Sequence, residues 1–395
     1  MRCCPSGKIF MNETKSLLGL ARLMKMAFDG KDLSPLGEEF IRRIEADPRD
    51  AEAMMDLSTL LQLKFQPEVA LSIQAQALAQ KTLYHLPAKY PGGIRLLSLN
   101  APGDLMTNAP LEFLVEDSDI SLHMLYVGEG LTLPAELPEH DLLFVAVGES
   151  DRTSLLLEDL EAAVSNWHCP VLNLPRNILK TSREAAPGWL SGVEGVSMPQ
   201  ALRVSREALA DLPLPCPFIA RPVGSHAGNG LAKMENREEL DAYLESRREP
   251  EFHVSPFVDY RSRDGLFRKY RVAIIDGLPH ACHMGISSSW MIHYLNSGME
   301  ESANKRAEEE DFMVNFESGF GARHAAAFSG IHRSLGLDYF ILDCAETRDG
   351  KLLVFEIDTG AVIHAMDPED LFPYKAPQMR KVFAAFRNML SDHEA

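Results

Sequence analysis

The sequence has few of the features that mark several large classes of protein. Its 395 residues include only six cysteines, none in a C-x-x-C pair, so a disulfide-stapled fold is not indicated. Acidic residues outnumber basic residues by 57 to 39, and the resulting net charge of −18 would repel a phosphate backbone. No apolar run approaches the roughly 20 residues that a membrane-spanning helix needs. We therefore expect no nucleic-acid partner and no membrane span.

The remaining composition is typical of a globular protein with several domains. Hydrophobic residues make up 46% of the chain and charged residues 24%, which excludes bulk disorder. The first residues include Cys3 and Cys4 but no apolar segment of a secretory signal. We expect a cytoplasmic protein in which these two thiols are incidental. Three patterns follow one another and predict a helical module, a small parallel α/β domain and an α+β domain at 1–90, 91–180 and 181–395.

Residues 12–86 are predicted to be helical throughout. Their second half resembles one tetratricopeptide unit, with helices at 50–64 and 67–85 and a proline at a favourable first helical position. Gln74 stands where such a repeat usually has a large apolar residue. The other packing positions are occupied by Met54, Ser58, Leu61, Ala70 and Ala77. Only one unit is clear, and solenoids need about three. We interpret the module as a cap on the rest of the protein, with a peptide-binding groove as the alternative.

Short apolar strands alternate with helices after residue 93, which predicts the parallel α/β domain. The strands are expected at 94–99, 121–127, 142–147 and 170–174, with a helix at 155–167. No G-x-G-x-x-G follows the first strand, so the dinucleotide fingerprint is absent. Asn108, Glu112 and Asp117 follow that strand and either line a ligand crevice or only solvate the surface.

The most informative feature is a predicted hairpin at residues 339–358, the carboxylate hairpin. A two-residue Asp-Gly turn at its tip places Asp343 opposite Glu356, with Asp358 on the same face. The flanking residues are apolar, so three carboxylates would gather where like charges repel. Such oxygen ligands suit Mg²⁺ or Mn²⁺, and Mg²⁺ normally shares its shell with substrate phosphates. The alternative is a solvent-facing sheet edge with ordinary acidic residues.

A second predicted hairpin, at residues 269–284, carries cations and is called the basic hairpin here. Its Asp-Gly turn places Lys269 and Arg271 on one face. The same face is expected to carry His280, Cys282 and Met284, and the opposite face His283. Two cations beside carboxylates suit a phosphate or a substrate carboxylate. His364, six residues after the carboxylate strand, is a candidate substrate contact.

A glycine-rich loop follows a strand predicted at 217–223. Gly224, Ser225, Gly228 and Gly230 would let backbone amides approach an anion closely. The Walker A spacing is missing, so this is not a P-loop. Together with the carboxylate hairpin, the loop predicts a nucleotide site. Arg221 at the end of the strand and Lys180 upstream are the candidate phosphate contacts.

In this order the motifs resemble those of the ATP-grasp superfamily of carboxylate–amine ligases, of the ribosomal-protein glutamate ligase and glutathione synthetase type. The resemblance covers residues 94–390 and implies a two-lobed ATP-grasp fold after an α/β pre-domain. The matched motifs are Lys180, Arg221-Pro222 with the loop 224–230, the adenine hinge 254–258, Lys269-Tyr270-Arg271, and Asp343 with Glu356-Ile357-Asp358. The last set matches the ligands of two Mg²⁺ ions in the family.

The resemblance implies ATP and Mg²⁺ (or Mn²⁺) as ligands. Metal would be held by Asp343, Glu356 and Asp358, and catalysis would use Arg271 and Arg221. ATP would be bound by Lys180, Arg221, Gly224, Ser225, Gly228, Gly230, Pro256, Phe257 and Val258. The implied reaction activates a carboxylate as an acylphosphate and joins it to an amine of an amino acid, peptide or related small molecule. A kinase of the same fold and a non-catalytic ATP-binding scaffold are the alternatives, and a homodimer stays open.

Four positions depart from the family pattern. Arg221 replaces a lysine, Pro256 replaces a glutamate or glutamine, Lys269 replaces an aspartate, and Asp358 replaces an asparagine. The first exchange keeps the charge but changes its geometry. The last adds negative charge where metal is expected. These departures bear on the substrate more than on ATP binding.

Overall fold

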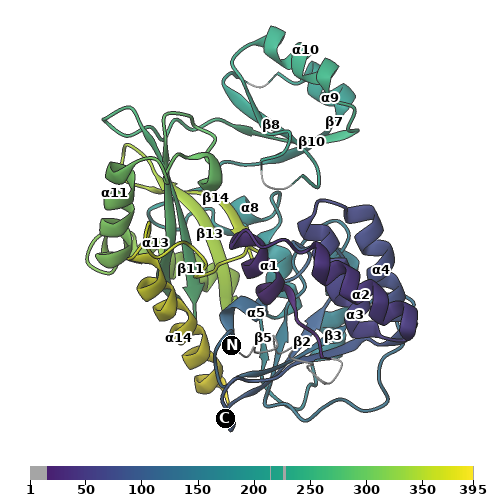
Figure 1. Cartoon of the computed structure of the whole chain (residues 1–395). Coiled ribbons are helices and arrows are strands. Elements are labelled where there is room, and N and C mark those ends of the chain that lie inside the picture. Colours follow the sequence, from purple (N-terminus) through teal and green to yellow (C-terminus); the bar gives the residue numbers. More distant parts are fainter. Residues whose placement is uncertain (1–15, 214, 226–227, 395) are drawn as a thin grey trace, which may run out of the picture.

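The computed structural model describes residues 16–213, 215–225 and 228–394, so Cys3 and Cys4 lie outside it. Figure 1 shows a helical module (purple) beside the first sheet, the third sheet (green to yellow) on the other side, and a four-stranded sheet standing apart at the top. The mixture of helices and sheets predicted from the sequence is confirmed. Across the described ranges, no helix has both the length and the apolar character to cross a membrane.

The module consists of four helices. These are α1 (Leu20–Phe28), α2 (Ser34–Ala46), α3 (Ala51–Leu63) and α4 (Pro67–Gln80). The side chain of Asp50 accepts a hydrogen bond from the Ala53 amide at 3.0 Å and caps the start of α3. The predicted helix up to residue 85 was wrong, because α4 ends at Gln80 and β1 (Leu83–Leu86) then pairs antiparallel with β3 (Ser121–Tyr126). The chain thus enters the first sheet before the predicted boundary at residue 90.

Gln74 explains how the module is attached. Its side-chain amide donates to the Gly103 carbonyl at 2.9 Å and accepts from the Gly103 amide at 2.8 Å. A tetratricopeptide repeat usually has an apolar residue at the position of Gln74. Here the polar side chain bonds the module to a loop of the next domain. Buried side chains of α3 and α4, such as Met54 and Ala77, belong to the same hydrophobic cluster as the first and third sheets. The module therefore packs on the rest of the protein, as the cap interpretation predicts.

Two carboxylates fix the N-terminal end of α1 at this junction. Asp56 accepts from the amides of Leu18 and Gly19 at 2.9 and 3.0 Å, and Glu112 accepts from the Ala21 amide at 3.1 Å. Burial raises the pKa of Glu112 to about 7 and that of Asp56 to about 6, against the opposing effect of these amides.

A small cavity of about 70 Å³ lies beside these carboxylates. Asn108 and Glu112 line it, as the crevice interpretation predicts, whereas Asp117 is exposed and pairs with Lys89 at 2.6 Å. Tyr84 also lines this cavity, and its buried hydroxyl has no hydrogen-bond partner among the described residues. A cavity of this size has room for a few water molecules.

The first sheet has the order β1-β3-β2-β4-β5, in which β2 pairs parallel with β3 and β4, and β4 with β5. The predicted parallel α/β arrangement is confirmed. The remaining elements are β2 (Arg95–Asn100), β4 (Leu142–Val145), β5 (Val171–Leu172), α5 (Leu111–Leu114), α6 (Ser154–Val164), α7 (Pro175–Ile178), a 3-10 turn η1 (Leu179–Thr181) and α8 (Ala186–Trp189).

The third sheet has the order β12-β11-β13-β14-β6 and carries both hairpins. Its strands are β6 (Val196–Ser197), β11 (Phe267–Ile275), β12 (Leu278–Ser287), β13 (Tyr339–Glu346) and β14 (Leu352–Asp358). The helical elements that follow β12 are η2 (Tyr294–Asn296), α11 (Ala303–Val314), α12 (Phe320–Arg323), α13 (Ala325–Leu335) and α14 (Lys375–His393).

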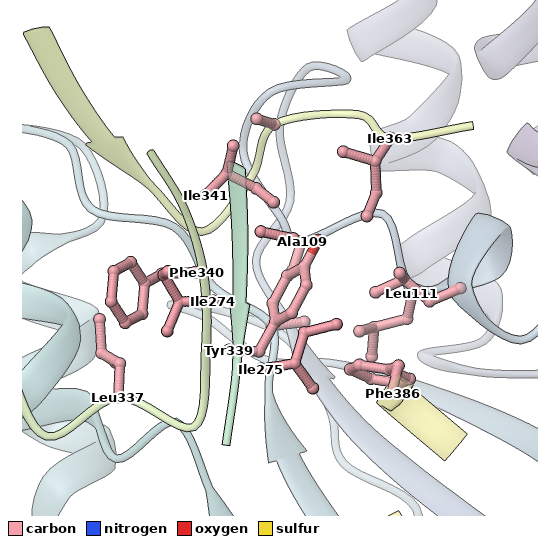
Figure 2. Packing of buried hydrophobic residues seen from close by; sticks show 14 of the residues in the cluster. Ala109, Leu111, Ile274, Ile275, Leu337, Tyr339, Phe340, Ile341, Ile363 and Phe386 are labelled. Carbon is pink, nitrogen blue, oxygen red and sulfur yellow. The ribbon is translucent and has the colours of Figure 1, made fainter. Parts of the chain in front are cut away.

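Apolar packing joins this sheet to the first domain. Figure 2 shows Tyr339 of β13, Leu111 of α5 and Phe386 of α14 in one apolar cluster, and the Tyr339 and Phe386 rings meet edge to face at 5.5 Å. Arg387 of α14 also pairs with Asp119 at 2.8 Å. One continuous core therefore includes residues of the module, the first sheet and the third sheet.

The four-stranded sheet forms a separate lobe in the order β7-β10-β8-β9. Its elements are β7 (Leu202–Ser205), α9 (Arg206–Asp211), β8 (Phe218–Pro222), β9 (Ala232–Met234), α10 (Arg237–Ser246) and β10 (Glu251–Pro256). The lobe has its own small core, built around Leu209, Phe218 and Phe252. This lobe and the third sheet form the two main walls of the site described next.

We predict that Glu112→Gln flattens the dependence of stability on pH. The pKa of Glu112 is raised from 4.5 to about 7 in the folded chain, so its contribution is present below pH 4.5 and lost as the pH rises through 7. Because Glu112 is only partly buried, we expect a difference of about 2 kcal/mol in this window. Urea unfolding at pH 5 and pH 8 measures it. Glu116→Gln, an exposed neighbour, is the control, and an equal pH dependence in the two variants would contradict the assignment.

Candidate active site

A cavity of about 370 Å³ separates the lobe from the third sheet, a size typical of ligand pockets. Its polar lining groups several charged side chains that are far apart in the sequence. These are Arg183, Arg221, Lys269, Arg271, Asp343, Glu356 and Asp358. Four cations and three carboxylates therefore face one space.

The carboxylate hairpin has the predicted pairing but a different turn. Asp343 lies opposite Glu356, and Asp358 lies opposite Ile341. The connection at the tip is longer than two residues, since the Thr347 amide donates to the Lys351 carbonyl at 2.9 Å. The register then shifts between Asp343 and Cys344, and the two irregularities cancel. The prediction that these three carboxylates gather at one place is confirmed.

Two cations neutralise Asp343. Arg271 donates to both carboxylate oxygens, with Nε at 2.8 Å from Oδ1 and Nη2 at 3.0 Å from Oδ2. Lys269 places its Nζ 2.7 Å from Oδ2. Burial alone would raise the pKa of Asp343, but these two cations outweigh it and hold the pKa well below its usual range. Asp343 is thus a permanent anion with three hydrogen bonds from cations.

The basic hairpin differs from its predicted register. Its strands follow the Asp-Gly turn up to Val272, after which a bulge shifts the pairing. Arg271 therefore lies opposite His283, and Lys269 opposite Gly285. The prediction that His283 points away from the cations was wrong. On their other side the cations meet β13, where Arg271 lies opposite Asp343.

Arg183 is a site residue that the sequence reasoning missed. It follows η1 in the linker and makes a short ion pair with Glu356 Oε1. No motif points to it, because its position depends on how the linker turns toward the third sheet. Glu184, the next residue, accepts from His253 of the lobe at 2.9 Å. The linker thus contacts both walls of the cavity.

Lys180 occupies a different place from the one predicted. Its Nζ donates to the Leu335 carbonyl at 2.8 Å, at the end of α13, and lies 4.7 Å from the centre of the Trp189 ring. It does not belong to the lining of the cavity among the residues that the structure describes. The structure therefore assigns Lys180 to the support of a helix end, where a cation is favourable.

Asp358 is the least compensated of the three carboxylates. Its Oδ1 accepts from the Gly360 amide at 2.6 Å, and no cation of the described chain lies within ion-pair distance of it. Burial and the neighbouring Glu356 raise the pKa of Asp358 to about 6. This group and the second oxygen of Glu356 are where an added cation would lower the energy most.

Arg221 and the glycine-rich loop form the opposite wall. The guanidinium of Arg221 donates to the side chain of Ser225 at 3.1 Å and to its carbonyl. Burial, with Arg183 nearby, lowers the pKa of Arg221 to about 10. Gly228 lines the cavity with φ at 69°, and a Cβ there would meet the His293 ring at 2.3 Å. Gly224, Ser225 and Gly230 are not in the lining, and residues 226–227 lie outside the described chain.

The predicted hinge forms an apolar part of the cavity. Pro256, Phe257 and Val258 all line it, facing Leu353 and Phe355 of the carboxylate hairpin. The Phe257 amide donates to the Pro217 carbonyl at 3.1 Å, so it is already used within the lobe. This apolar part of the cavity lies beside the charged residues of the third sheet, and such an arrangement suits a ligand with a flat ring and an anionic chain.

His364 is not in this lining but joins the site to the module. Its ring lies 5.4 Å from that of Phe28, at the end of α1. The loop after the carboxylate strand therefore packs on the N-terminal helix. The prediction that His364 touches a substrate has no support in this arrangement.

The donor set fits a divalent metal at Glu356 and Asp358. Both are carboxylates two residues apart on β14 with side chains on one face, and oxygen donors suit Mg²⁺ or Mn²⁺. Asp343 fits less well, because its two oxygens already accept three hydrogen bonds from Arg271 and Lys269.

Comparisons with known proteins give structural matches only. No protein-family model and no curated protein matches the chain. Among solved structures it is similar to the VanG D-Ala:D-Ser ligase from Enterococcus faecalis, at 14% identity and a TM-score of 0.46 over 77% of this chain and 100% of that one.

A RimK domain ATP-grasp protein from Sphaerobacter thermophilus matches at 17% identity and a TM-score of 0.44, over 75% of this chain and 98% of that one. The ATP-grasp ligase PsnB, in complex with the precursor peptide PsnA2 and AMPPNP, matches at 14% identity and a TM-score of 0.42, over 76% and 97%. Two of the three carry the name of the superfamily that the sequence motifs resemble. All scores lie below 0.5, and the function is argued below from this chain's own geometry.

We predict different effects for Arg221→Ala and Lys180→Ala, although the sequence indicates a phosphate contact for both residues. Arg221→Ala should weaken binding of Mg·ATP about 10-fold to 100-fold, since a hydrogen bond to a charged group contributes about 1.5–3 kcal/mol. Lys180→Ala should leave the affinity within about twofold and lower the melting temperature, because it removes a donor to the end of α13. Calorimetric titration and thermal melts measure both effects. Loss of affinity in Lys180→Ala alone would reverse the assignment.

Proposed function

We propose that this chain is an ATP-dependent ligase that activates a carboxylate and joins it to an amine. The observation that carries the proposal is the charge arrangement of the cavity. Asp358 and the second carboxylate oxygen of Glu356 lie on its floor without a hydrogen bond from a cation of the described chain. Arg183, Arg221 and Arg271 line the same cavity, next to the apolar residues Pro256–Val258. A triphosphate with a divalent cation and a flat base matches these three features.

The proposed reaction has two steps. A carboxylate oxygen of the first substrate forms a bond to the γ-phosphorus of ATP, and the bond to the ADP oxygen breaks. The amine of the second substrate then forms a bond to the acyl carbon, and phosphate leaves with the former carboxylate oxygen. The sum is amide, ADP, phosphate and one proton. ATP is consumed because an unactivated carboxylate has no good leaving group.

The residues of the chain have separate tasks in this scheme. A bound Mg²⁺ would neutralise phosphate oxygens, and Glu356 and Asp358 would hold it. Arg221 and Arg183, from opposite walls, would bind the phosphates from two sides. Arg271 is fixed by Asp343 and by the Val362 carbonyl at 3.3 Å, so it presents a rigid cation to the group in transfer. The lobe would cover the site and keep water from the acylphosphate.

The substrate is proposed to be a small molecule or a peptide. The cavity volume of about 370 Å³ accommodates a nucleotide and leaves the second substrate to approach from the open side. The structure of PsnB, one of the similar proteins, is that of a complex with a precursor peptide. ADP release screened against pooled amino acids and peptides, with mass spectrometry of the products, tests the class. A stable phosphoester would show a kinase instead, and no ADP release with any pool would contradict the proposal.

We predict that Glu356→Gln lowers turnover about 10²-fold to 10³-fold while the fold survives. The change removes a proposed metal ligand where phosphate charge develops. It also breaks the ion pair with Arg183, but both side chains are partly exposed, so the unfolding free energy should change by about 1 kcal/mol or less.

The matched control is Glu308→Gln, which removes an Arg–Glu pair of the same kind with Arg268 and does not line the cavity. ADP formation and urea unfolding would be measured on the same samples. Equal turnover in the two variants would remove Glu356 from the site. A Glu356→Gln chain that unfolds while the control stays folded would make this glutamate structural.

A further inference from the structure

The cations at Asp343 restrict what the carboxylate hairpin can bind. A carboxylate offers about four acceptor sites on its two oxygens. Arg271 uses one site on each oxygen, and Lys269 uses a further one on Oδ2, at distances of 2.7 to 3.0 Å. Asp343 is about 5% exposed, so neither cation is held there by chance contact at the surface. A metal ion would have to displace a partly buried cation that is hydrogen-bonded to Asp343.

The other two carboxylates are differently placed. Asp358 has one donor, the Gly360 amide on Oδ1, and Glu356 has Arg183 on Oε1. Within the described chain no cation donates a hydrogen bond to Asp358 Oδ2 or Glu356 Oε2. Both residues project from one strand toward the cavity. These acceptors thus lie together on β14, and β13 separates that strand from the strand of Lys269.

We propose that the site binds one divalent cation, at Glu356 and Asp358, and that the ammonium group of Lys269 occupies the place of a second one at Asp343. This inference rests on the proposed function and specifies its metal requirement. Lys269 supplies a fixed positive charge beside the phosphates at all physiological concentrations of metal. The chain would therefore need only one Mg²⁺ with the nucleotide.

Lys269 is suited to this place by its position as well as its charge. It stands two residues before Arg271 on β11, so both side chains leave the same face of the sheet. A compact ammonium with three donors can serve Asp343 and still offer hydrogen to a phosphate oxygen. Asp343 then acts as a positioning residue for two cations.

Mn²⁺ with AMPPNP provides a test that does not depend on turnover. A single bound Mn²⁺ gives a six-line electron paramagnetic resonance spectrum, whereas two ions about 3.5–4 Å apart couple and change its shape. We expect one Mn²⁺ per wild-type chain and an uncoupled spectrum. In Lys269→Met, which keeps the length of the side chain and removes its charge, we expect the stoichiometry to rise to two and coupling to appear.

Two further variants keep the test decisive. Lys269→Arg retains the charge and should keep one Mn²⁺. Lys351→Ala removes an exposed lysine from the turn of the carboxylate hairpin, so it is the control and should also keep one Mn²⁺. Thermal melts check that each variant is folded, and Lys269→Gln replaces the methionine variant if that one is not. Two coupled ions in the wild type, or one ion in both neutral variants, would overturn the role of Lys269 and leave the ligase proposal standing. No binding of Mn·AMPPNP to the wild type would overturn both.

Discussion

The pairing of Asp343 with Arg271 and Lys269 is the interaction on which the site depends. It places a buried carboxylate against two cations of the adjacent strand β11, which makes the charged floor of the cavity stable before any ligand arrives. Removing Asp343 would leave two like charges side by side without their shared anion. The same pairing leaves Glu356 and Asp358 as the acceptors for an added cation. One contact thus fixes the position of Arg271 and leaves Glu356 and Asp358 as the place proposed for a metal.

The rest of the fold holds this sheet in place. A continuous apolar core joins the module, the first sheet and the third sheet, and Gln74 and Glu112 add polar contacts at the junction. The lobe has a separate core, and its contact with the linker includes the His253–Glu184 hydrogen bond. The carboxylates and cations of β11, β13 and β14 are therefore attached to the large core, whereas Arg221 is attached to the smaller core of the lobe. The module contacts the loop after the carboxylate strand through Phe28 and His364.

Local sequence signals predicted the elements well and their contacts less well. The alternation of residues around the two Asp-Gly turns correctly predicted both hairpins and the Asp343–Glu356 pair. In the carboxylate hairpin the turn is longer than the predicted two residues, and a bulge restores the predicted register. The sequence carries no signal for the bulge in the basic hairpin. That bulge places His283 opposite Arg271, on the face where the prediction did not expect it. Lys180 and Arg183 are three residues apart in one linker, and only the path of η1 decides which of them faces the cavity. The sequence predicts helix at the short strand β1 because the apolar residues of β1 continue the apolar spacing of α4.

In the proposed reaction the carboxylate substrate itself takes the phosphoryl group from ATP. The most direct test is to run the reaction in ¹⁸O-enriched water, with a pool that supports ADP release, and to analyse the phosphate by mass spectrometry. If an acylphosphate forms, the fourth oxygen of the phosphate comes from the substrate carboxylate, and the phosphate contains no oxygen from the solvent. Phosphate that carries one solvent ¹⁸O would show that water attacks ATP directly and would contradict the account.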